Sequence, residues 1–333
     1  MWSGTGGAEI RSVTSTITWA NRWDHFLARW GVKRGRHRVA PGLYALDDPT
    51  PDSLVFVTAN YTLSFDALRS ALAGRDAYIL VLDTEGINVW CAAGKGTFGT
   101  EELVHRIEET GLADAVGHRR LILPQLGAPG VAAHEVKRRT GFAVEYGPVR
   151  AADLPEYLKA GKATPEMRRV QFGLCDRAVL IPVELAHVLL PMMAAAAALF
   201  FLGGPLAAGG LVAAVLAGVV LFAILLPCIP SRAFSSKGLI LGGLVALPFG
   251  LASLANGEGG GWLRWASAVT YLLAMTPVTA FLALNFTGST PSTSRSGVRR
   301  EIFTYIPIMG SMFALGIVLV LVVVVARLAG GLR

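Results

Sequence analysis

Residues 76–83 of this 333-residue chain have the sequence DAYILVLD, and residues 84–98 continue with TEGINVWCAAGKGTF. The first eight residues place an unbroken apolar run between two aspartates, which is typical of a short strand buried on both faces of a sheet. Small residues and one cysteine dominate the second stretch. We therefore expect a buried strand that ends at Asp83 and delivers a glycine-rich turn to one edge of a sheet.

The same alternation of elements recurs through residues 41–160. Three more short apolar segments are predicted strands, at 52–60, 118–127 and 142–149. Helices are predicted between them over 64–72, 100–110 and 131–140, the last with Gly141 as its C-cap. Strand–helix repetition predicts a doubly wound parallel sheet, a Rossmann-like α/β domain.

Ligands of such sheets bind at the carboxyl ends of the strands. Here these ends are residues 59–64, 83–97, 125–130 and 146–148. The second contains Gly94-Lys95-Gly96-Thr97, which looks like part of a phosphate-binding loop but lacks the glycine five residues before Gly94. Nucleotide binding is therefore not favoured.

Composition separates the rest of the chain from this domain. The whole sequence is 53% hydrophobic and 16% charged, with a net charge of +7, whereas soluble domains average roughly 25% charged residues. Residues 178–333 hold eight basic and three acidic residues, and residues 1–177 hold the other 22 and 20. A wholly soluble protein is excluded. The basic excess lies beside apolar runs, which indicates membrane topology rather than nucleic-acid binding.

Crossing about 30 Å of hydrocarbon takes about 20 apolar residues. Five runs are candidates, at about 178–202, 206–227, 239–254, 266–286 and 308–326. The loops at 228–238 and 287–301 and the segment before the first run are basic, whereas the other two loops are almost uncharged. Basic loops stay in the cytoplasm. We therefore expect a multi-pass protein of the inner membrane, with the amino-terminal domain inside and the carboxyl terminus outside.

Four regions follow from these patterns. They are a helical or irregular segment at 1–40, the sheet domain at 41–160, a basic linker at 161–177 and a transmembrane domain at 178–333. No basic stretch followed by an apolar run opens the chain, so residues 1–30 are not expected to be a signal peptide.

Three cysteines are too few for a disulfide scaffold, a Cys₄ zinc site or a self-held Cys₄ iron–sulfur cluster. Cys91 stands between Trp90 and two alanines at a predicted strand end. Small residues there let the backbone approach a flat macrocycle closely. Two interpretations remain open: the thiolate faces a ligand at the strand ends, or Cys91 is a small buried hydrophobe.

Residues 88–95, Asn-Val-Trp-Cys-Ala-Ala-Gly-Lys, are similar to the signature of the mercury-methylating corrinoid proteins, the HgcA family, which reads N-[VI]-W-C-A-[AG]-G-K. The resemblance extends to Pro41–Tyr44, Thr62–Asp66 and Leu123–Leu126. It also includes the layout of a cytoplasmic corrinoid domain followed by five spans, and covers nearly the whole chain after about residue 20. The family is related to the large subunits of corrinoid iron–sulfur proteins, which carry a cluster domain that this chain lacks.

This resemblance implies a corrinoid (cobalamin) cofactor bound base-off, with Cys91 as the lower axial ligand of cobalt. A thiolate donates more charge to a metal than imidazole does, which favours delivery of methyl as a carbanion equivalent to the soft electrophile Hg(II), forming methylmercury. The His-on signature D-x-H-x-x-G of cobalamin methyltransferases is absent. A ferredoxin-like iron–sulfur partner, HgcB, is expected to supply electrons and mercury, and a methyl-folate pathway protein to supply methyl groups.

The candidate site therefore has Cys91 as its catalytic and cobalt-binding residue. The candidate cofactor-binding residues are Thr62, Ser64, Asn88, Val89, Trp90, Cys91, Ala92, Ala93, Gly94, Lys95, Gly96, Gln125, Gly127, Tyr146 and Gly147. Of these, Thr62, Ser64 and the residues after Gly96 rest on the strand-end rule alone.

Three functions remain under comparison. The first is a corrinoid-dependent methyltransferase acting on Hg(II), and the second is a membrane-anchored corrinoid methyl carrier of acetyl-CoA-type one-carbon metabolism. The third is a corrinoid- or metal-binding protein without turnover. Cys175 and Cys228 both fall at the predicted cytoplasmic membrane face, as two unrelated apolar cysteines or as a relay for Hg(II).

Overall fold

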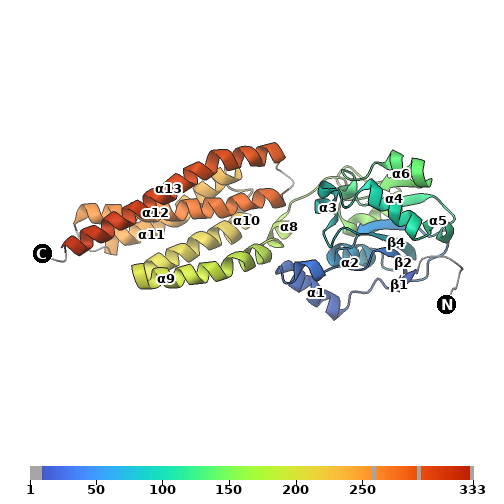
Figure 1. The fold of residues 1–333 in the computed structure, drawn as a ribbon, viewed down its shortest axis with the longest axis horizontal. Helices are drawn as coiled ribbons and strands as arrows, with labels where there is room; N and C mark the ends of the chain where they lie inside the picture. Colours follow the sequence, from blue (N-terminus) through green and yellow to red (C-terminus); the bar gives the residue numbers. More distant parts are fainter. Residues whose placement is uncertain (1–9, 257–259, 291–293, 331–333) are drawn as a thin grey trace. The chain divides into compact units, whose positions relative to one another are not determined.

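The computed structural model describes residues 10–256, 260–290 and 294–330. The chain divides into two compact units, which we call the amino-terminal unit, ending at Gln171, and the helical unit, beginning at Phe172 (Figure 1). The segment predicted as a linker, 161–177, is shared between them. Met167 is buried in the core of the amino-terminal unit, whereas α8 (Leu174–Ala178) belongs to the helical unit.

A six-stranded sheet organises the amino-terminal unit, in the order β1-β2-β4-β3-β5-β6. The strands are β1 (Arg11–Val13), β2 (Gly42–Leu46), β3 (Val55–Ala59), β4 (Ala77–Leu82), β5 (Arg120–Leu123) and β6 (Ala143–Tyr146). The last four are the four strands predicted from the sequence. They pair in parallel, so their carboxyl ends share one edge of the sheet.

The prediction of a purely parallel sheet is wrong at one side. β2 runs antiparallel to β4, and β1 joins β2 in parallel, so the sheet is mixed. No helix separates β2 from β3, and β4 inserts between them. The strand–helix alternation that predicted β3 to β6 could not reveal β2, because β2 lacks the flanking helix on which that pattern depends.

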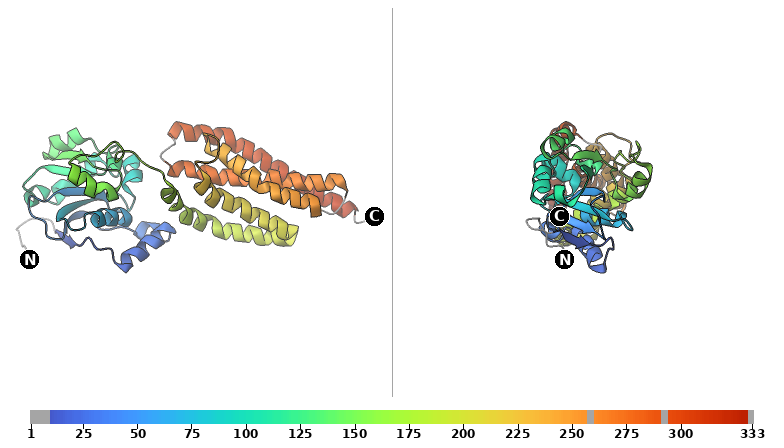
Figure 2. Two further views of the ribbon diagram at one scale, coloured as in Figure 1. Left: turned by 180° about the vertical axis from the view of Figure 1, so that it is seen from behind. Right: turned by 90° about the vertical axis from the view of Figure 1, so that its right-hand side faces the viewer.

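Helices cover both faces of the sheet (Figure 2). These helices are α2 (Thr62–Ala71), α3 (Val89–Lys95), α4 (Thr100–Glu109), α5 (Leu112–Ala115), α6 (Ala133–Thr140) and α7 (Leu154–Ala160). Alternate residues of β4 enter two cores: Leu80 packs with α4 and α6, and Ile79 with α2 and α7. Burial on both faces explains why the strand is an unbroken apolar run. Gly141, with φ 79°, ends α6 as predicted.

The segment predicted as helical or irregular, 1–40, contributes more regular structure to the unit than expected. Its described part contains β1, helix α1 (Trp19–Arg29) and the 3₁₀ turn η1 (Arg34–Arg36). Two further 3₁₀ turns, η2 (Gln125–Gly127) and η3 (Ala151–Asp153), follow β5 and β6 at the carboxyl edge of the sheet. These turns help to form the site described below.

The helical unit contains four continuous helical segments that are long and apolar enough to cross a membrane, among the residues that the structure describes. Its elements after α8 are α9 (Ile181–Leu216), the π-helical η4 (Ala217–Leu221), α10 (Phe222–Leu225), α11 (Phe234–Asn256), α12 (Gly261–Asn285), η5 (Phe286–Ser289) and α13 (Arg295–Gly330). Part of the predicted loop at 256–261 lies outside the described residues.

The first apolar segment, Leu174–Leu225, has 52 residues, far more than the roughly 20 that one crossing needs. It is interrupted at Gly204, which has the non-helical angles φ 78° and ψ −178°. Val188 and Met192, before this glycine, pack with Leu211 and Val215, after it. The chain therefore doubles back (Figure 1), at the position where the sequence predicts a loop between two spans.

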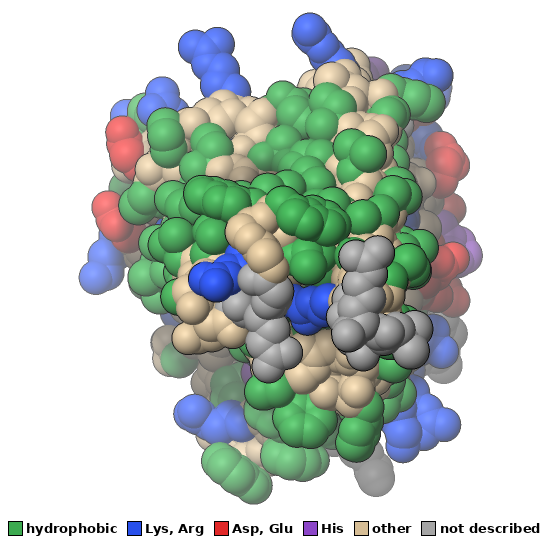
Figure 3. All heavy atoms as spheres, turned by 90° about the vertical axis from the view of Figure 1, so that its left-hand side faces the viewer, with side chains coloured by type: hydrophobic (Ala, Val, Ile, Leu, Met, Phe, Trp, Pro, Cys, Tyr) green, Lys and Arg blue, Asp and Glu red, His purple; other side chains and the backbone are tan. Residues whose placement is uncertain are grey.

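Small residues bring the helices of this unit close together. A Cβ atom added to Gly238 of α11 would lie 2.6 Å from Ala280 Cα of α12, and one added to Gly242 would lie 2.8 Å from the Thr276 carbonyl oxygen. The outer surface of the helical unit is apolar, and Phe201 and Leu202 on it are each 85% exposed. Figure 3 shows hydrophobic side chains over most of the end nearest the carboxyl terminus. Such a surface suits contact with lipid.

Candidate functional site

Asn60 holds the turn that leads from β4 to the candidate motif. Its side chain is 1% exposed, and its Oδ1 accepts hydrogen bonds from the amides of Thr84 at 3.1 Å and Gly86 at 2.9 Å. Its Nδ2 donates to Asp83 Oδ1 at 2.9 Å. Glu85 and Gly86 both have positive φ, 58° and 73°. One buried amide therefore stabilises an otherwise unfavourable backbone path.

The motif itself is a helix rather than the glycine-rich turn expected from the sequence. Asn88 is the N-cap of α3, and its Oδ1 accepts the Cys91 amide hydrogen at 3.0 Å. Gly96, with φ 92°, ends the helix as its C-cap. The glycines of the motif thus lie in the last turn of a short helix and at its C-cap. Trp90 and Cys91 lie on its first turn, and both are exposed.

The small residues of the motif pack against protein. Ala92 is fully buried and Ala93 is 6% exposed, both in the core on the α4 side of the sheet. A Cβ atom added to Gly130 would lie 3.1 Å from Ala93 Cα and 2.1 Å from the Phe98 carbonyl oxygen. Small side chains are therefore required where α3 meets the 127–130 segment. Gly127 is likewise in contact with the Phe98 ring.

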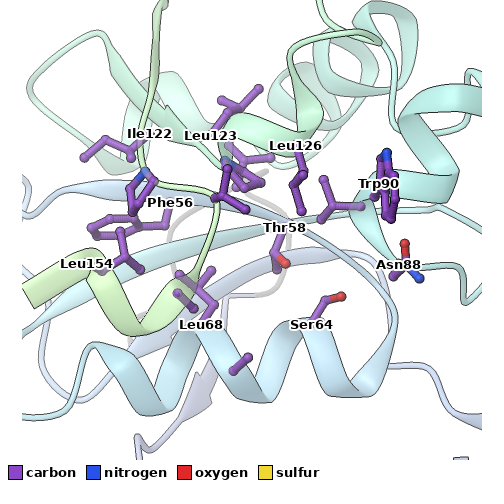
Figure 4. Close-up of a pocket in the computed structure, with 17 residues that line it drawn as sticks. Phe56, Thr58, Ser64, Leu68, Asn88, Trp90, Ile122, Leu123, Leu126 and Leu154 are labelled. Atoms are coloured by element: carbon purple, nitrogen blue, oxygen red, sulfur yellow. The ribbon is translucent and has the colours of Figure 1, made fainter. Parts of the chain in front are cut away.

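A cavity of about 300 Å³ opens beside α3, at the carboxyl edge of the parallel strands. It is lined by β3, α2, the start of α3, the residues after β5 and β6, and η3 and α7. Figure 4 shows Asn88 and Trp90 at one end, Phe56 and Leu154 at the other, and the hydroxyls of Thr58 and Ser64 between them. None of the described lining residues is charged.

The structure brings four of the predicted site residues together in this cavity: Ser64, Asn88, Val89 and Trp90. The others lie elsewhere in the unit. Thr62 is half-buried at the start of α2, and Cys91, Gly94, Lys95 and Gly96 are exposed on or after α3. Ala92, Ala93, Gly127 and Gly147 are buried.

Two predicted residues make contacts within the protein. Gln125 Oε1 accepts a hydrogen bond from Arg168 Nη1 at 2.9 Å. Tyr146 donates its hydroxyl hydrogen to the Val131 carbonyl oxygen at 2.6 Å, and burial raises the pKa of this phenol. Both side chains connect segments that approach the strand ends, so in this structure they organise the loops around the cavity.

Sequence reasoning missed most of the apolar lining. Phe56, Leu68, Ile122 and Leu154 come from segments far apart in the chain and cannot be told from ordinary core residues by pattern. Among these missed lining residues, Thr58 is the one that its sequence position could have identified. It is the polar residue of the apolar strand Val55–Ala59, one position from the strand's carboxyl end, and it is 3% exposed.

Among the described ranges, no group of three or more His, Cys, Asp or Glu side chains could hold a metal ion. One exposed thiol lies on the same turn of α3 as two side chains that line an apolar cavity. This combination fits a cofactor that brings most of its own metal ligands and accepts one from the protein.

Known proteins that are similar to this chain match it over the amino-terminal unit. Residues 33–158 match the family described as the CO dehydrogenase/acetyl-CoA synthase delta subunit. The acetyl-CoA decarbonylase/synthase complex subunit gamma of Methanopyrus kandleri is 37% identical over 128 residues, which are 38% of this chain and 27% of that subunit.

Two other relatives give similar coverage. The subunit gamma of Archaeoglobus fulgidus is 36% identical over 124 residues, 37% of this chain and 26% of that subunit. The corrinoid/iron–sulfur protein large subunit of Moorella thermoacetica is 27% identical over 129 residues, 38% of this chain and 28% of that subunit. The chain thus spans about a quarter of the length of these relatives. The amino-terminal unit is similar to subunits of acetyl-CoA decarbonylase/synthase complexes and to a corrinoid/iron–sulfur protein large subunit, and its cavity lies within the matched region.

Proposed function

We propose that the protein is a membrane-anchored, corrinoid-dependent methyltransferase whose acceptor is Hg(II). The observation that carries the proposal is the exposed thiol of Cys91 on the turn of α3 whose neighbours, Asn88 and Trp90, line the cavity at the strand ends. The similarity of this region to a corrinoid/iron–sulfur protein large subunit supports the cofactor. The sequence of residues 88–95 supports the acceptor.

The size of the cavity favours a base-off arrangement. Its volume, about 300 Å³, is at the lower limit of small-molecule pockets, roughly 300–1,000 Å³. It suits the nucleotide tail of a corrinoid rather than the whole cofactor. Apolar walls from Phe56, Leu68 and Leu154 would hold the aromatic base, with the hydroxyls of Thr58 and Ser64 available to its polar atoms. Withdrawal of the tail into the cavity would leave one face of the cobalt free for a protein ligand.

Cys91 is the residue that would fill that position. A bound corrinoid would supply methyl-transfer chemistry toward a soft acceptor such as Hg(II). A thiolate sulfur donates charge to the metal and so favours loss of the methyl group with its electron pair. Asn88 fixes the first turn of α3 on which the thiol lies, and Trp90 lines the same end of the cavity.

The proposal includes partners because the chain lacks the means to restore the cofactor. With three cysteines it cannot hold its own Cys₄ cluster, so we propose a ferredoxin-like iron–sulfur protein, HgcB, as donor of electrons and mercury. A methyl-folate pathway protein is the proposed methyl donor. The helical unit would anchor this chemistry in the inner membrane with the amino-terminal unit in the cytoplasm, as the basic loops indicate.

A second candidate function is favoured by the comparisons. Two of the three named relatives are subunits of acetyl-CoA decarbonylase/synthase complexes and the third is a corrinoid/iron–sulfur protein subunit, which favours a corrinoid methyl carrier of one-carbon metabolism. The two functions share the cavity and the cofactor and differ in the acceptor. A carrier that delivers methyl as a cation would gain nothing from a thiolate ligand, because charge donated by sulfur favours loss of methyl with its electron pair.

The decisive experiment compares the purified, corrinoid-supplied protein with its Cys91→Ala variant. We expect both to bind cobalt, the variant to show a shifted absorption spectrum from loss of the sulfur ligand, and only the wild type to methylate Hg(II) after methyl loading. Cys175→Ser and Cys228→Ser are matched thiol controls, and each is expected to keep the wild-type spectrum.

Three results would contradict parts of the proposal. Retained Hg(II) methylation by Cys91→Ala would refute the thiolate mechanism. A wild-type protein that binds cobalt and passes methyl only to one-carbon acceptors would establish the second function instead. Absence of cobalt from both proteins would refute corrinoid binding.

Cys175 and Cys228 are tested as a relay for Hg(II) with the Cys175→Ser/Cys228→Ser double variant. Lower methylation by this variant at limiting mercury would support the relay, and an unchanged rate would refute it.

A further inference from the structure

Helix α1 presents its aromatic side chains to solvent. Trp19, Trp23 and Phe26 are 79%, 54% and 48% exposed, and α1 has no fully buried residue. These three positions, followed by Trp30, recur at intervals of four, three and four residues, so they form one stripe along the helix. We call these four side chains the aromatic stripe. A surface helix of a soluble domain normally turns such a stripe toward the core.

The opposite face of α1 is fastened to the unit by polar contacts. His25 Nε2 lies 2.7 Å from Asp66 Oδ2, and Asp66 Oδ1 accepts a hydrogen bond from Arg69 Nε at 2.7 Å. Asp66 is 2% exposed, so this contact is anchored in α2 and within the protein. Asp24 Oδ1 lies 2.8 Å from His37 Nδ1. The outward direction of the stripe is therefore a consequence of specific contacts.

The stripe is also ordered before it meets any partner. Thr18 and Asn21 form a capping box at the start of α1. The Trp23 and Phe26 rings stack with centroids 5.3 Å apart, and those of Phe26 and Trp30 lie 6.0 Å apart. Arg69 Nη1 donates to the Thr14 and Thr16 carbonyl oxygens, which holds the strand leading into the helix.

A dense positive charge accompanies the stripe. Residues 22–38 contain six basic residues and one acidic residue, a net charge of +5 without histidine. The basic residues, all exposed, are Arg22, Arg29, Lys33, Arg34, Arg36 and Arg38. At 100° per residue, Arg22 and Arg29 both lie along one edge of the stripe. The one carboxylate, Asp24, is on the fastened face.

We propose that the aromatic stripe and these basic residues dock α1 on the surface of an anionic lipid bilayer. Helices with aromatic residues on one face and Lys or Arg beside it lie in the membrane interface, where tryptophan is itself favoured. Each basic residue near an anionic leaflet strengthens association by about five-fold. The same chain carries four helical segments of membrane-spanning length, so a bilayer is within its reach.

This inference goes beyond methyl transfer and does not depend on the cofactor. Docking of α1 would keep the amino-terminal unit at the lipid surface instead of leaving it free on its connection to the helical unit. A lipid surface fits the observations better than an acidic protein, because the aromatic stripe offers interfacial rings, and charge alone would suffice for a soluble acidic partner.

The test uses the intact protein in nanodiscs and the fluorescence of the α1 tryptophans. Their contribution is the difference between wild type and the Trp19→Phe/Trp23→Phe/Trp30→Phe variant. We expect acyl-brominated lipid to quench this contribution at least about two-fold in discs containing phosphatidylglycerol, and less in purely zwitterionic discs. Trp262 and Trp265, exposed on the helical unit, give the positive control for quenching through a matching double Phe variant.

Charge variants separate lipid attraction from general effects. Arg22→Gln/Arg29→Gln/Arg34→Gln should reduce the quenching in anionic discs to the zwitterionic level. The matched control, Arg75→Gln/Lys137→Gln/Lys159→Gln, removes equal charge from exposed positions elsewhere in the unit and should leave it unchanged. Circular dichroism checks that each variant is folded.

Two outcomes would overturn the proposal. One is α1 fluorescence that brominated lipid does not quench while Trp262 and Trp265 are quenched. The other is shielding of the α1 tryptophans from solvent that appears only when a nanodisc holds two copies of the protein. That result would show that a second chain, and not lipid, covers the aromatic stripe. Loss of cobalt binding or of methyl transfer would bear on the proposed function and leave this inference unaffected.

Discussion

Asn88 has two roles at the residue scale: it accepts the Cys91 amide hydrogen at 3.0 Å and contributes its side chain to the cavity lining. The position of the thiol therefore depends on a capping amide three residues earlier in the chain. Asn60 extends the same dependence back to β3, because it holds the turn that places Asn88. Cys91 is exposed, which removes the interpretation of a buried small hydrophobe.

We expect Asn88→Ala to fray the first turn of α3 and to lower the free energy of unfolding by about 1 kcal/mol, since a lost N-cap leaves an amide without its acceptor. Hydrogen exchange of residues 89–92 in the intact protein would report the fraying as faster exchange. Asn88→Asp keeps an acceptor and should exchange almost as slowly as wild type. Equal protection in the Ala variant would show that the cap is dispensable.

Tyr146→Phe tests whether this tyrosine organises the protein or binds cofactor. Loss of the hydrogen bond to Val131 should lower stability by about 1 kcal/mol while cobalt binding is retained. Burial raises the pKa of Tyr146 above its ordinary value of 10.0, so the folded state favours the neutral phenol. The advantage of Tyr over Phe is therefore fully present below pH 10 and is lost as the pH rises through the folded pKa.

Thermal unfolding followed by near-ultraviolet circular dichroism, at neutral pH and above pH 10, measures this difference. The melting temperatures of wild type and Tyr146→Phe should converge at the higher pH. Loss of bound cobalt at neutral pH, with an unchanged melting temperature, would instead place the hydroxyl on the cofactor.

At the level of secondary structure, α3 and α9 depend on small residues at specific positions. α3 makes a helix from a stretch rich in small residues, because Ala92, Ala93 and Gly130 allow it to pack closely on the following loop. α9 contains a reversal at Gly204 that separates two antiparallel apolar helices. Both features depend on glycine or alanine at positions where a larger side chain would collide or the backbone would be strained.

Gly204→Ala should destabilise the reversal by about 1–3 kcal/mol, because φ 78° with ψ −178° belongs to a region that side chains essentially exclude. Gly243 of α11 is the matched control, since nothing lies within 4 Å of an added Cβ atom there. Gly243→Ala should be neutral or stabilising by about 0.5–1 kcal/mol. Melting of the two variants in detergent gives the comparison, and an equal effect of both would contradict the argument.

At the scale of the whole molecule, two units with different chemistry share one chain. Residues 1–177, which include the amino-terminal unit, are charge-balanced with 22 basic and 20 acidic residues, and the helical unit is apolar on its surface. Charge asymmetry among its loops predicts the sidedness of that unit in a membrane. The additional charge of residues 22–38 lies in the amino-terminal unit, where it supports the proposed docking of α1.

Reporter fusions test the predicted topology. A reporter placed in the 228–238 loop should be active only in the cytoplasm, and reporters at 256–261 and after the carboxyl terminus only outside. A carboxyl-terminal reporter active in the cytoplasm would show an even number of crossings. Inactivity of the cytoplasmic reporter in the 228–238 loop would refute the assignment of two crossings to the segment that turns at Gly204.

Features that depend on local pattern were predictable from the sequence. The four parallel strands β3 to β6, the helices α2, α4 and α6, the end of α6 at Gly141 and the apolar helical segments all followed from hydrophobic periodicity and glycine position. The motif at residues 88–95 was also evident as a stretch of unusual composition. Such features are predictable because each element buries its own apolar face, and that requirement is written into neighbouring residues.

How these elements pack against one another is seen in the folded protein and not in the sequence pattern. β4 lies between β2 and β3, so β2 joins the sheet antiparallel, and the cavity collects Phe56, Ile122 and Leu154 from distant segments. The orientation of α1 also depends on residues far apart in the sequence, because the contact between His25 and Asp66 turns its aromatic stripe outward. These outcomes depend on which faces pack together, and hydrophobic pattern alone does not specify the partner of a face.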